Sequence, residues 1–269
     1  MNKQKILSFF LLLLFVISCN QKVPITNRRQ LILIPENELL SMSFSQYTDF
    51  IRTNEVLPRY HKDFVLVEKV GKRIQQAVQE YMRDKGMGKR IEGYQWEFNT
   101  VEDPTVNAWC MPGGKVVVYS GLLPVTQDET GLAIVMGHEI AHAVARHGNE
   151  RMSQQMAIQL GGVALSVALN SKSQETQNIF MQSYGLTSQL GILKYSRTHE
   201  SEADKMGLIF AALAGYDPNA AIGFWQRMAE QSKGNKPPEL LSTHPSDETR
   251  IKDIKAFMPE AMKYYRKYE

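Results

Sequence analysis

The 269-residue sequence lacks the features that mark several classes of protein. It has only two cysteines, too few for a small fold held together by disulfides. The 31 lysines and arginines nearly balance the 28 acidic residues, and no basic cluster marks a surface for nucleic acid. Beyond the N-terminus, no apolar run suggests a series of membrane spans, which excludes a polytopic membrane protein. What remains is a globular chain with 43% hydrophobic residues, enough for a real core.

The first 18 residues have the layout of a secretory signal. Lys3 and Lys5 precede an unbroken apolar stretch from Phe9 to Ile17. The stretch ends in Val-Ile-Ser before Cys19, which resembles the bacterial lipobox, where a peptidase cuts before a cysteine that carries a diacylglycerol. We therefore expect residues 1–18 to be a lipoprotein signal peptide and Cys19 to be lipidated. The alternative is an ordinary secretory signal in which the cysteine stands by chance.

Most of the remaining sequence has the period of amphipathic helices. The expected helices cover residues 37–52, 63–84, 128–147, 149–169, 198–214, 218–231 and 246–265. The apolar stretch Met156–Leu169 could suggest a membrane span. It is too short for one and contains Gly161-Gly162, so a buried or mobile core helix is the better interpretation.

One part of the chain has the period of strands. Apolar residues alternate with polar ones at Tyr94, Trp96 and Phe98, which predicts a half-buried strand. A second extended piece, 106–111, reaches the turn Pro-Gly-Gly, and 116–119 is the return strand. The sequence therefore predicts a mostly helical α+β fold with a small sheet.

We expect the mature chain to form one domain. No repeat is visible at the periods of solenoids or propellers. Residues 19–35 are interpreted as a lipidated N-terminus and lead-in segment, and residues 36–269 as a single domain.

The motif His-Glu-Ile-Ala-His at residues 138–142 carries the main chemical information. On a helix, His138 and His142 lie about 40° apart, so both imidazoles project from one face. This spacing suits two ligands of a tetrahedral zinc ion. Glu139 lies beside them, where it can take a proton from a zinc-activated water and later pass it to the leaving amine. Two surface histidines on an amphipathic helix are the alternative.

A catalytic zinc site needs a third protein ligand. His147 lies on the opposite side of the helical wheel from His138, so we interpret it as a helix C-terminal residue that interacts with the dipole. On a later helix, Glu200 and Asp204 share one face: a glutamate ligand could complete the site, and an aspartate one turn later could hold a ligand imidazole. Together with Glu202, these acids could instead form a solvated face, and spacing alone leaves both interpretations open.

The motif at 138–142, together with the later Ser-Arg-x-x-Glu-x-x-Ala-Asp, resembles the HtpX and CAAX prenyl endopeptidase family of gluzincin zinc metallopeptidases. Within that family the chain looks most similar to a soluble periplasmic lipoprotein branch, and it departs from the integral branch in lacking the transmembrane helices of that branch. Further matching stretches are Val-Pro-Ile-Thr at 23–26, Arg-Arg-Gln-Leu at 28–31, Asn-Ala-Trp at 107–109 and Thr-His-Pro-Ser at 243–246.

The resemblance implies roles for individual residues. It implies that His138, His142 and Glu200 bind one zinc ion per chain and that Glu139 is the catalytic base. It also implies that Asp204 holds a ligand imidazole through the ring nitrogen that does not bind the metal.

The resemblance also implies a role for a loop histidine. His244 would lie near the metal, where it either stabilises the oxyanion or caps the zinc at rest; a simple turn residue is the alternative. Arg250 could assist the oxyanion or tie its loop down, and the sequence does not separate these.

The segment before the Pro-Gly-Gly turn resembles the family's substrate-aligning edge strand, which would border the active-site helix. Asn107, Ala108 and Trp109 would align an extended peptide through main-chain hydrogen bonds. Cys110 beside them could suggest a cysteine nucleophile, but no neighbouring group would activate it, so a buried structural thiol is the better interpretation.

These observations predict a zinc-dependent endopeptidase that degrades misfolded or stalled cell-envelope proteins. It would be anchored through Cys19 in a bacterial membrane, which we expect to be the outer membrane, and face the periplasm. The main alternative is a non-proteolytic quality-control adaptor that binds unfolded strands, although a purely structural zinc site has no need of Glu139. A prenyl-protein protease would need transmembrane helices that form a membrane chamber, and we do not find them in this sequence. An aminopeptidase would need a motif that binds the free amine of its substrate, and we find none.

Overall fold

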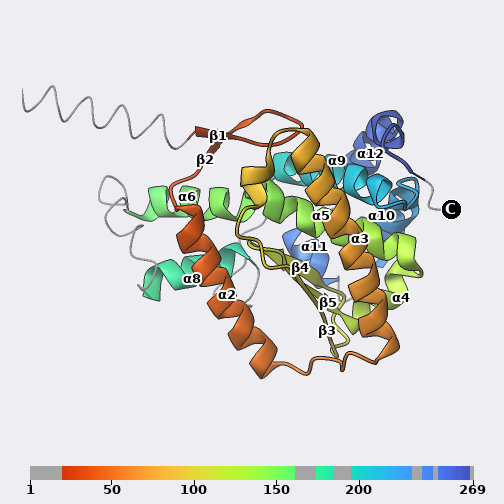
Figure 1. Ribbon diagram of the computed structural model, residues 1–269, viewed down its shortest axis with the longest axis horizontal. Coiled ribbons are helices and arrows are strands. Elements are labelled where there is room, and N and C mark those ends of the chain that lie inside the picture. The colour runs from red at the N-terminus through yellow and green to blue at the C-terminus, as the bar shows by residue number, and fades with distance from the viewer. Residues whose placement is uncertain (1–19, 161–173, 185–194, 232–237, 245–247, 267–269) are drawn as a thin grey trace, which may run out of the picture.

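The computed structural model describes residues 20–160, 174–184, 195–231, 238–244 and 248–266. In this part of the chain, helices surround a small three-stranded sheet (Figure 1). The helices are α2 Glu36–Thr53, α3 Lys62–Asp84, α4 Leu123–Thr126, α5 Glu129–Ala145, α6 His147–Leu160, α8 Gln174–Ser183, α9 Arg197–Leu213, α10 Ala220–Gln231, α11 Glu239–Thr243 and α12 Glu248–Met262. The strands are β1 Asn20–Lys22, β2 Arg29–Leu31, β3 Glu97–Val101, β4 Ala108–Met111 and β5 Lys115–Tyr119, with single 3-10 turns at Gly88–Ile91 and Ser120–Leu122.

The predicted mostly helical α+β fold is confirmed. The helices expected at 37–52 and 63–84 are α2 and α3 within a residue at each end, and those expected further along correspond to α5, α6, α9, α10 and α12. The strand expected around Trp96 begins only at Glu97. The β1–β2 hairpin and the short helices α4, α8 and α11 are not predicted from the sequence.

The three-stranded sheet has the order β3-β5-β4, so β4 is an edge strand. β4 and β5 form the predicted antiparallel hairpin, whereas β3 runs parallel to β5. Gly113 and Gly114 form its turn with φ values of +85° and +80°, which only glycine adopts at little cost. β4 also contacts α5, as expected of an edge strand beside the active-site helix.

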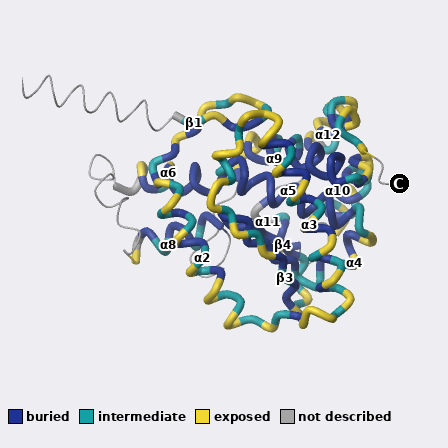
Figure 2. The backbone as a smooth tube through the Cα atoms, viewed as in Figure 1, coloured by how far each residue is buried: buried dark blue, intermediate teal, exposed yellow. Residues whose placement is uncertain are grey.

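Helix α5 lies in the middle of the molecule and is buried from Gly131 to Ala145 (Figure 2). Its N-terminus is capped by Asp128, whose side chain accepts a hydrogen bond from Gly131 N at 2.8 Å. The helix is apolar around its circumference, as a helix packed on all sides must be. It contacts α3, α9, α10 and β4, so any polar side chain on it has to find partners inside the protein.

Helices α5 and α9 touch backbone to backbone. A Cβ atom on Gly137 would lie 2.9 Å from the carbonyl oxygen of Gly207, and one on Gly207 would lie 2.8 Å from the backbone nitrogen of His138. Neither position therefore accepts a larger residue without moving a helix. This close approach brings the polar residues at the start of α9 within reach of the histidines of α5.

The segment before α2 packs against the rest of the protein. β1 and β2 pair antiparallel, and Val23 between them is fully buried in the main core. Residues 20–34 thus form part of the folded structure, on the side of the molecule where α6 begins. The division at residue 35 and the single domain from 36 to 269 stay predictions.

Two predictions fall wholly or partly outside the described residues. Residues 1–18 and Cys19 are not described, and of the apolar stretch Met156–Leu169 only the part within α6 is, where Met156 is buried. Among the residues that the structure does describe, we find no helix with the length and hydropathy needed to cross a bilayer.

Candidate metal centre and active site

Four buried side chains gather where α5, α9 and the end of α11 meet. They are His138, His142, Glu200 and His244, and one ligand atom from each lies within 4.8 Å of all the others. The Nε2 atoms of His138 and His142 are 3.0 Å apart, and they lie 3.5 Å and 3.4 Å from the Glu200 carboxylate. The structure therefore brings together the three ligands that the resemblance implies, with His244 as a further member.

This donor set fits a zinc ion. Ligand atoms about 2.0–2.1 Å from a tetrahedral zinc lie roughly 3.3 Å from one another, close to the separations of the His138, His142 and Glu200 donors. Two imidazoles and one carboxylate also match the ligand chemistry of catalytic zinc sites. Without a cation, these groups would be crowded in a buried space at considerable cost.

Glu139 lies beside this cluster but is not part of it. Its Oε1 atom is buried, accepts no hydrogen bond from the described residues and lies 3.5 Å from His244 Nε2. Burial raises the pKa of Glu139 to about 7, and the neighbouring Glu200 carboxylate adds to this effect. A carboxylate with such a pKa can both take up and release a proton near neutral pH.

The outer nitrogen of His138 is held by an acidic residue. His138 Nδ1 lies 2.9 Å from Asp204 Oδ1, as the spacing of Glu200 and Asp204 suggests. Arg250 binds both oxygens of Asp204 at 2.7 and 2.8 Å, and its guanidinium lies 3.3 Å from the ring centroid of Trp225. Arg250 also lies 3.1 Å from Glu200, so it ties the start of α12 to α9.

The outer nitrogen of His142 is held by a different kind of group. His142 Nδ1 lies 3.0 Å from Nδ1 of His147, whose Nε2 is 3.0 Å from Glu202 Oε2. The interpretation of His147 as a helix C-terminal residue is wrong, because α5 ends at Ala145 and His147 begins α6. Burial lowers the pKa of His147 to about 4, so it is neutral and makes no favourable interaction with a helix dipole.

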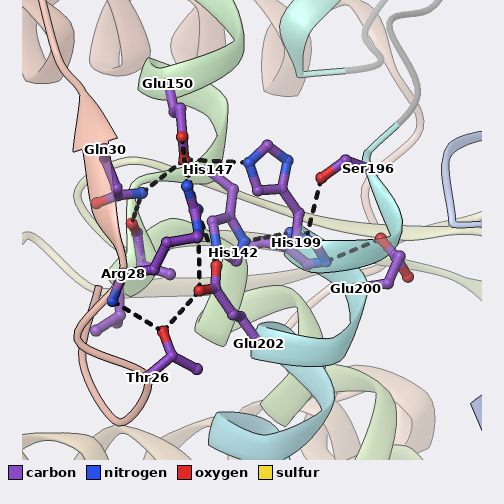
Figure 3. A network of polar contacts seen from close by, with 12 residues as sticks. Thr26, Arg28, Gln30, His142, His147, Glu150, Ser196, His199, Glu200 and Glu202 are labelled. Atoms are coloured by element: carbon purple, nitrogen blue, oxygen red, sulfur yellow. Dashed lines mark hydrogen bonds and ion pairs between the residues drawn. The ribbon is translucent and has the colours of Figure 1, made fainter. Parts of the chain in front are cut away.

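Glu202 belongs to a buried polar network that reaches the N-terminal segment (Figure 3). Arg28 lies between the carboxylates of Glu202 and Glu150, which are 3% and 4% exposed. Burial alone would raise the pKa of Glu202, but hydrogen bonds from His147, Arg28 and Thr26 outweigh it and lower the pKa to about 2. The interpretation of Glu202 as part of a solvated face is therefore wrong.

The edge strand and the candidate base line the same pocket. Asn107, Ala108 and Trp109 face this pocket together with Glu139 and His244. The indole of Trp109 packs edge-on against Phe50, with ring centroids 4.9 Å apart, which fixes the strand against α2. The structure thus places the predicted substrate strand next to the predicted catalytic residues.

Cys110 is buried, and it is the one free cysteine among the described residues. Burial raises the pKa of its thiol well above the ordinary value, and the charge of Glu139 adds to this effect. A thiol of this kind does not form the thiolate that a nucleophile needs. The interpretation of Cys110 as a structural thiol agrees with its position.

Comparison with known proteins gives the family. The model of peptidase family M48 matches residues 68–258, well over half of the chain. The chain belongs to peptidase family M48. Membership confirms the gluzincin resemblance and the prediction of a metalloendopeptidase.

Relatives of this M48 chain come from mitochondria and from bacteria. It is 36% identical over 242 residues to the mitochondrial metalloendopeptidase OMA1 of Schizosaccharomyces pombe, which covers 89% of this chain and 66% of that protein. Against the enzyme of the same name from Saccharomyces cerevisiae the identity is 31%, over 94% of this chain and 73% of the relative. With the beta-barrel assembly-enhancing protease of Yersinia pestis it is 34%, over 60% of this chain and 34% of that protein. The chain spans about a third of that bacterial relative, and its assignment to a lipoprotein branch stays a prediction.

Proposed function

We propose that this protein is a zinc-dependent endopeptidase that degrades misfolded or stalled proteins of the cell envelope. The observation that carries the proposal is the buried cluster of His138, His142 and Glu200 with Glu139 beside it, facing the pocket along β4. His138, His142 and Glu200 would hold one zinc ion, because their donor atoms have the separations that tetrahedral zinc requires.

Bound zinc would supply Lewis-acid chemistry, polarising the scissile carbonyl and acidifying the attacking water. Glu139 takes the proton from that water with its unpaired Oε1 and then delivers it to the leaving amine. Its pKa of about 7 suits both steps. Asp204 accepts a hydrogen bond from His138 Nδ1, which keeps Nε2 of that ring free to face the metal.

His244 has two possible tasks in this scheme. Its Nδ1 atom lies 3.2 Å from His138 Nε2 and 3.0 Å from Glu200, close enough to act as a fourth ligand and cap the zinc at rest. On displacement from that position, the same ring could donate a hydrogen bond to the carbonyl oxygen under attack. In the capped state the enzyme would be silent until a substrate moves the loop.

The edge strand favours unfolded substrates. Among the described residues β4 pairs only with β5, so a peptide could add to its other edge through main-chain hydrogen bonds. Recognition of this kind places a carbonyl without demanding one side-chain sequence. The bacterial relative from Yersinia pestis is named for beta-barrel assembly, which supports substrates among envelope proteins.

The N-terminal sequence supports an envelope location. We propose that Cys19 carries a lipid that anchors the protein in a bacterial membrane, the outer membrane with the protein facing the periplasm. Replacing Cys19 with Ala should release the protein into the soluble fraction after cell disruption. Continued fractionation of Cys19→Ala with membranes would contradict the lipid anchor.

Cleavage of unfolded casein tests the function. We expect the zinc-loaded wild type to cleave casein, and Glu139→Gln to retain one zinc per chain while cleaving at least about 100-fold more slowly. A zinc-chelated sample of the wild type should be inactive and should recover when zinc is restored.

Two results would contradict the endopeptidase proposal. One is cleavage by Glu139→Gln at the wild-type rate. The other is one bound zinc without cleavage in both the wild type and His244→Ala. The second result would favour the non-proteolytic adaptor, because His244→Ala removes the cap that could silence an enzyme, and loss of one hydrogen-bond donor to the carbonyl oxygen would slow cleavage without abolishing it.

A further inference from the structure

An arginine from the N-terminal segment, Arg28, lies between two buried carboxylates near the candidate metal centre. Arg28 donates to both oxygens of Glu150 at 2.6 and 2.8 Å, and to both oxygens of Glu202 at 2.9 Å. Thr26 donates a further hydrogen bond to Glu202 at 2.6 Å, and Gln30 donates one to Glu150 at 2.9 Å. This short segment therefore holds two buried carboxylates, one from α6 and one from α9, in fixed positions.

One of these carboxylates is connected to a candidate metal ligand. When Nε2 of His142 faces a metal ion, its Nδ1 carries a hydrogen and donates it to Nδ1 of His147, 3.0 Å away. The remaining hydrogen of the His147 ring is then on Nε2, which donates to Glu202 Oε2 at 3.0 Å. Each contact fixes the tautomer of the next ring, so the position of Glu202 determines how the His142 ring is held.

The other carboxylate provides a comparison within the same network. Glu150 is as buried as Glu202, shares Arg28 with it and also contacts a histidine, His199, at 3.1 Å. The chain of hydrogen bonds to His142 runs through Glu202 and His147 and does not include Glu150. A role in folding alone would make the two carboxylates equivalent, whereas a role in holding the metal ligand would not.

We propose that Arg28 and Glu202 are positioning residues for the metal ligand His142, acting through His147, so that the N-terminal segment sets the zinc affinity of the site. This inference rests on the proposed function, because it requires His142 to bind zinc. The segment lies far in sequence from the motifs that carry the ligands. It contacts Glu202 on the side of His147 that faces away from His142.

The matched pair Glu202→Gln and Glu150→Gln tests the inference. Both substitutions keep the shape of the side chain and remove one buried charge beside Arg28. We measure zinc affinity of the folded proteins by competition with a chelating dye, together with thermal unfolding. Glu202→Gln should lower the zinc affinity about 10-fold or more, as expected for loss of a group that orients a ligand. Glu150→Gln should lower the unfolding temperature while changing the zinc affinity less than about threefold.

Arg28→Ala tests the contribution of the segment itself. It should lower the zinc affinity by an amount similar to Glu202→Gln, because the first variant loosens and the second weakens the acceptor of the His147 ring. If Arg28→Ala does not fold, Arg28→Lys replaces it: a lysine keeps the charge but not the fork, and a loss of about threefold or more is expected.

The possible outcomes separate the two proposals. Equal zinc affinities for Glu202→Gln and Glu150→Gln would overturn the role of Glu202, and wild-type affinity in the Arg28 variant would overturn the role of the segment. A wild-type protein that binds no zinc at all would contradict the proposed function, and with it this inference. A wild type that binds one zinc tightly while Glu202→Gln binds it equally well would contradict this inference alone.

Discussion

The two histidines of the metal centre are supported in different ways. His138 is held directly by a carboxylate, Asp204, which Arg250 fixes from the C-terminal part of the chain. The Nδ1 atom of His142 is held by a neutral histidine, His147, and the carboxylate behind this contact, Glu202, binds His147 and not His142. The first arrangement fixes a ligand through charge and one hydrogen bond, while the second needs every member of a longer chain to be in place.

This difference teaches how the fold divides the task of holding a metal. Both supports start from α9, but one is completed by α12 and the other by the segment before α2. The two ends of the protein thus meet behind the same pair of histidines. A substitution in the segment before α2 should therefore act on the metal through His142, and one in α12 should act through His138.

The largest loss of zinc affinity should come from replacing Glu200, the candidate ligand that lies close to both histidines. The Glu200 carboxylate lies 3.5 Å from His138 Nε2 and 3.4 Å from His142 Nε2, so its loss removes the group between them. We expect Glu200→Gln to weaken zinc binding at least about 100-fold and to abolish casein cleavage at limiting zinc, because an uncharged amide is a far poorer zinc ligand than a carboxylate. Zinc titration with a competing dye measures this, and tight stoichiometric zinc in Glu200→Gln would mean that the third ligand is another residue.

A smaller effect should distinguish the direct support from the indirect one. Asp204→Asn removes the charge that accepts from His138 Nδ1, and we expect a loss of zinc affinity of about 10- to 100-fold. This loss should exceed that of Glu202→Gln, whose charge acts on His142 only through His147. Measuring both variants by the same dye competition ranks them. A larger loss of zinc affinity in Glu202→Gln than in Asp204→Asn would contradict the comparison between the direct support of His138 and the indirect support of His142.

The smallest effect concerns stability in acid. Burial opposes ionisation of Glu150, but hydrogen bonds from Arg28, His199 and Gln30 outweigh it and hold its pKa in the folded protein well below the ordinary 4.5. A lowered pKa contributes stability that is fully present above pH 4.5 and is lost as the pH falls below it, because the unfolded chain then binds more protons. Thermal unfolding of the wild type from pH 6 to pH 3 should therefore fall more steeply than that of Glu150→Gln. Parallel curves would show that this carboxylate is not the group responsible.

The ligand set is visible in the sequence because regular helices project residues at known angles. His138 and His142 share a face of α5, and Glu200 and Asp204 share a face of α9, four residues apart in each case, which is about one turn. The α2, α3 and α9 helices are likewise predicted, since their apolar residues repeat with the helical period. Sequence spacing thus identifies contacts that lie within one regular element.

The support of His142 is not visible because it depends on a break in the helix. Arg146 adopts a left-handed conformation with φ of 62° and ends α5, so the helical wheel does not extend to His147. The residue at this position is an arginine, and no glycine marks the helix end. The contact with Arg28 lies more than 100 residues away in sequence, and only the packing of three segments creates it. The parallel pairing of β3 with β5 cannot be predicted from the sequence either. The local pattern of apolar residues predicts strands but does not tell which strand lies in the centre of the sheet.

The most direct test of the metal centre is the position of zinc itself. Anomalous difference maps from crystals of the zinc-loaded protein, recorded on both sides of the zinc absorption edge, would locate the ion. We predict one peak per chain, within bonding distance of Nε2 of His138, Nε2 of His142 and the carboxylate of Glu200. A single peak elsewhere, for example between His147 and His199, or no peak in a protein that carries one zinc in solution, would contradict this assignment.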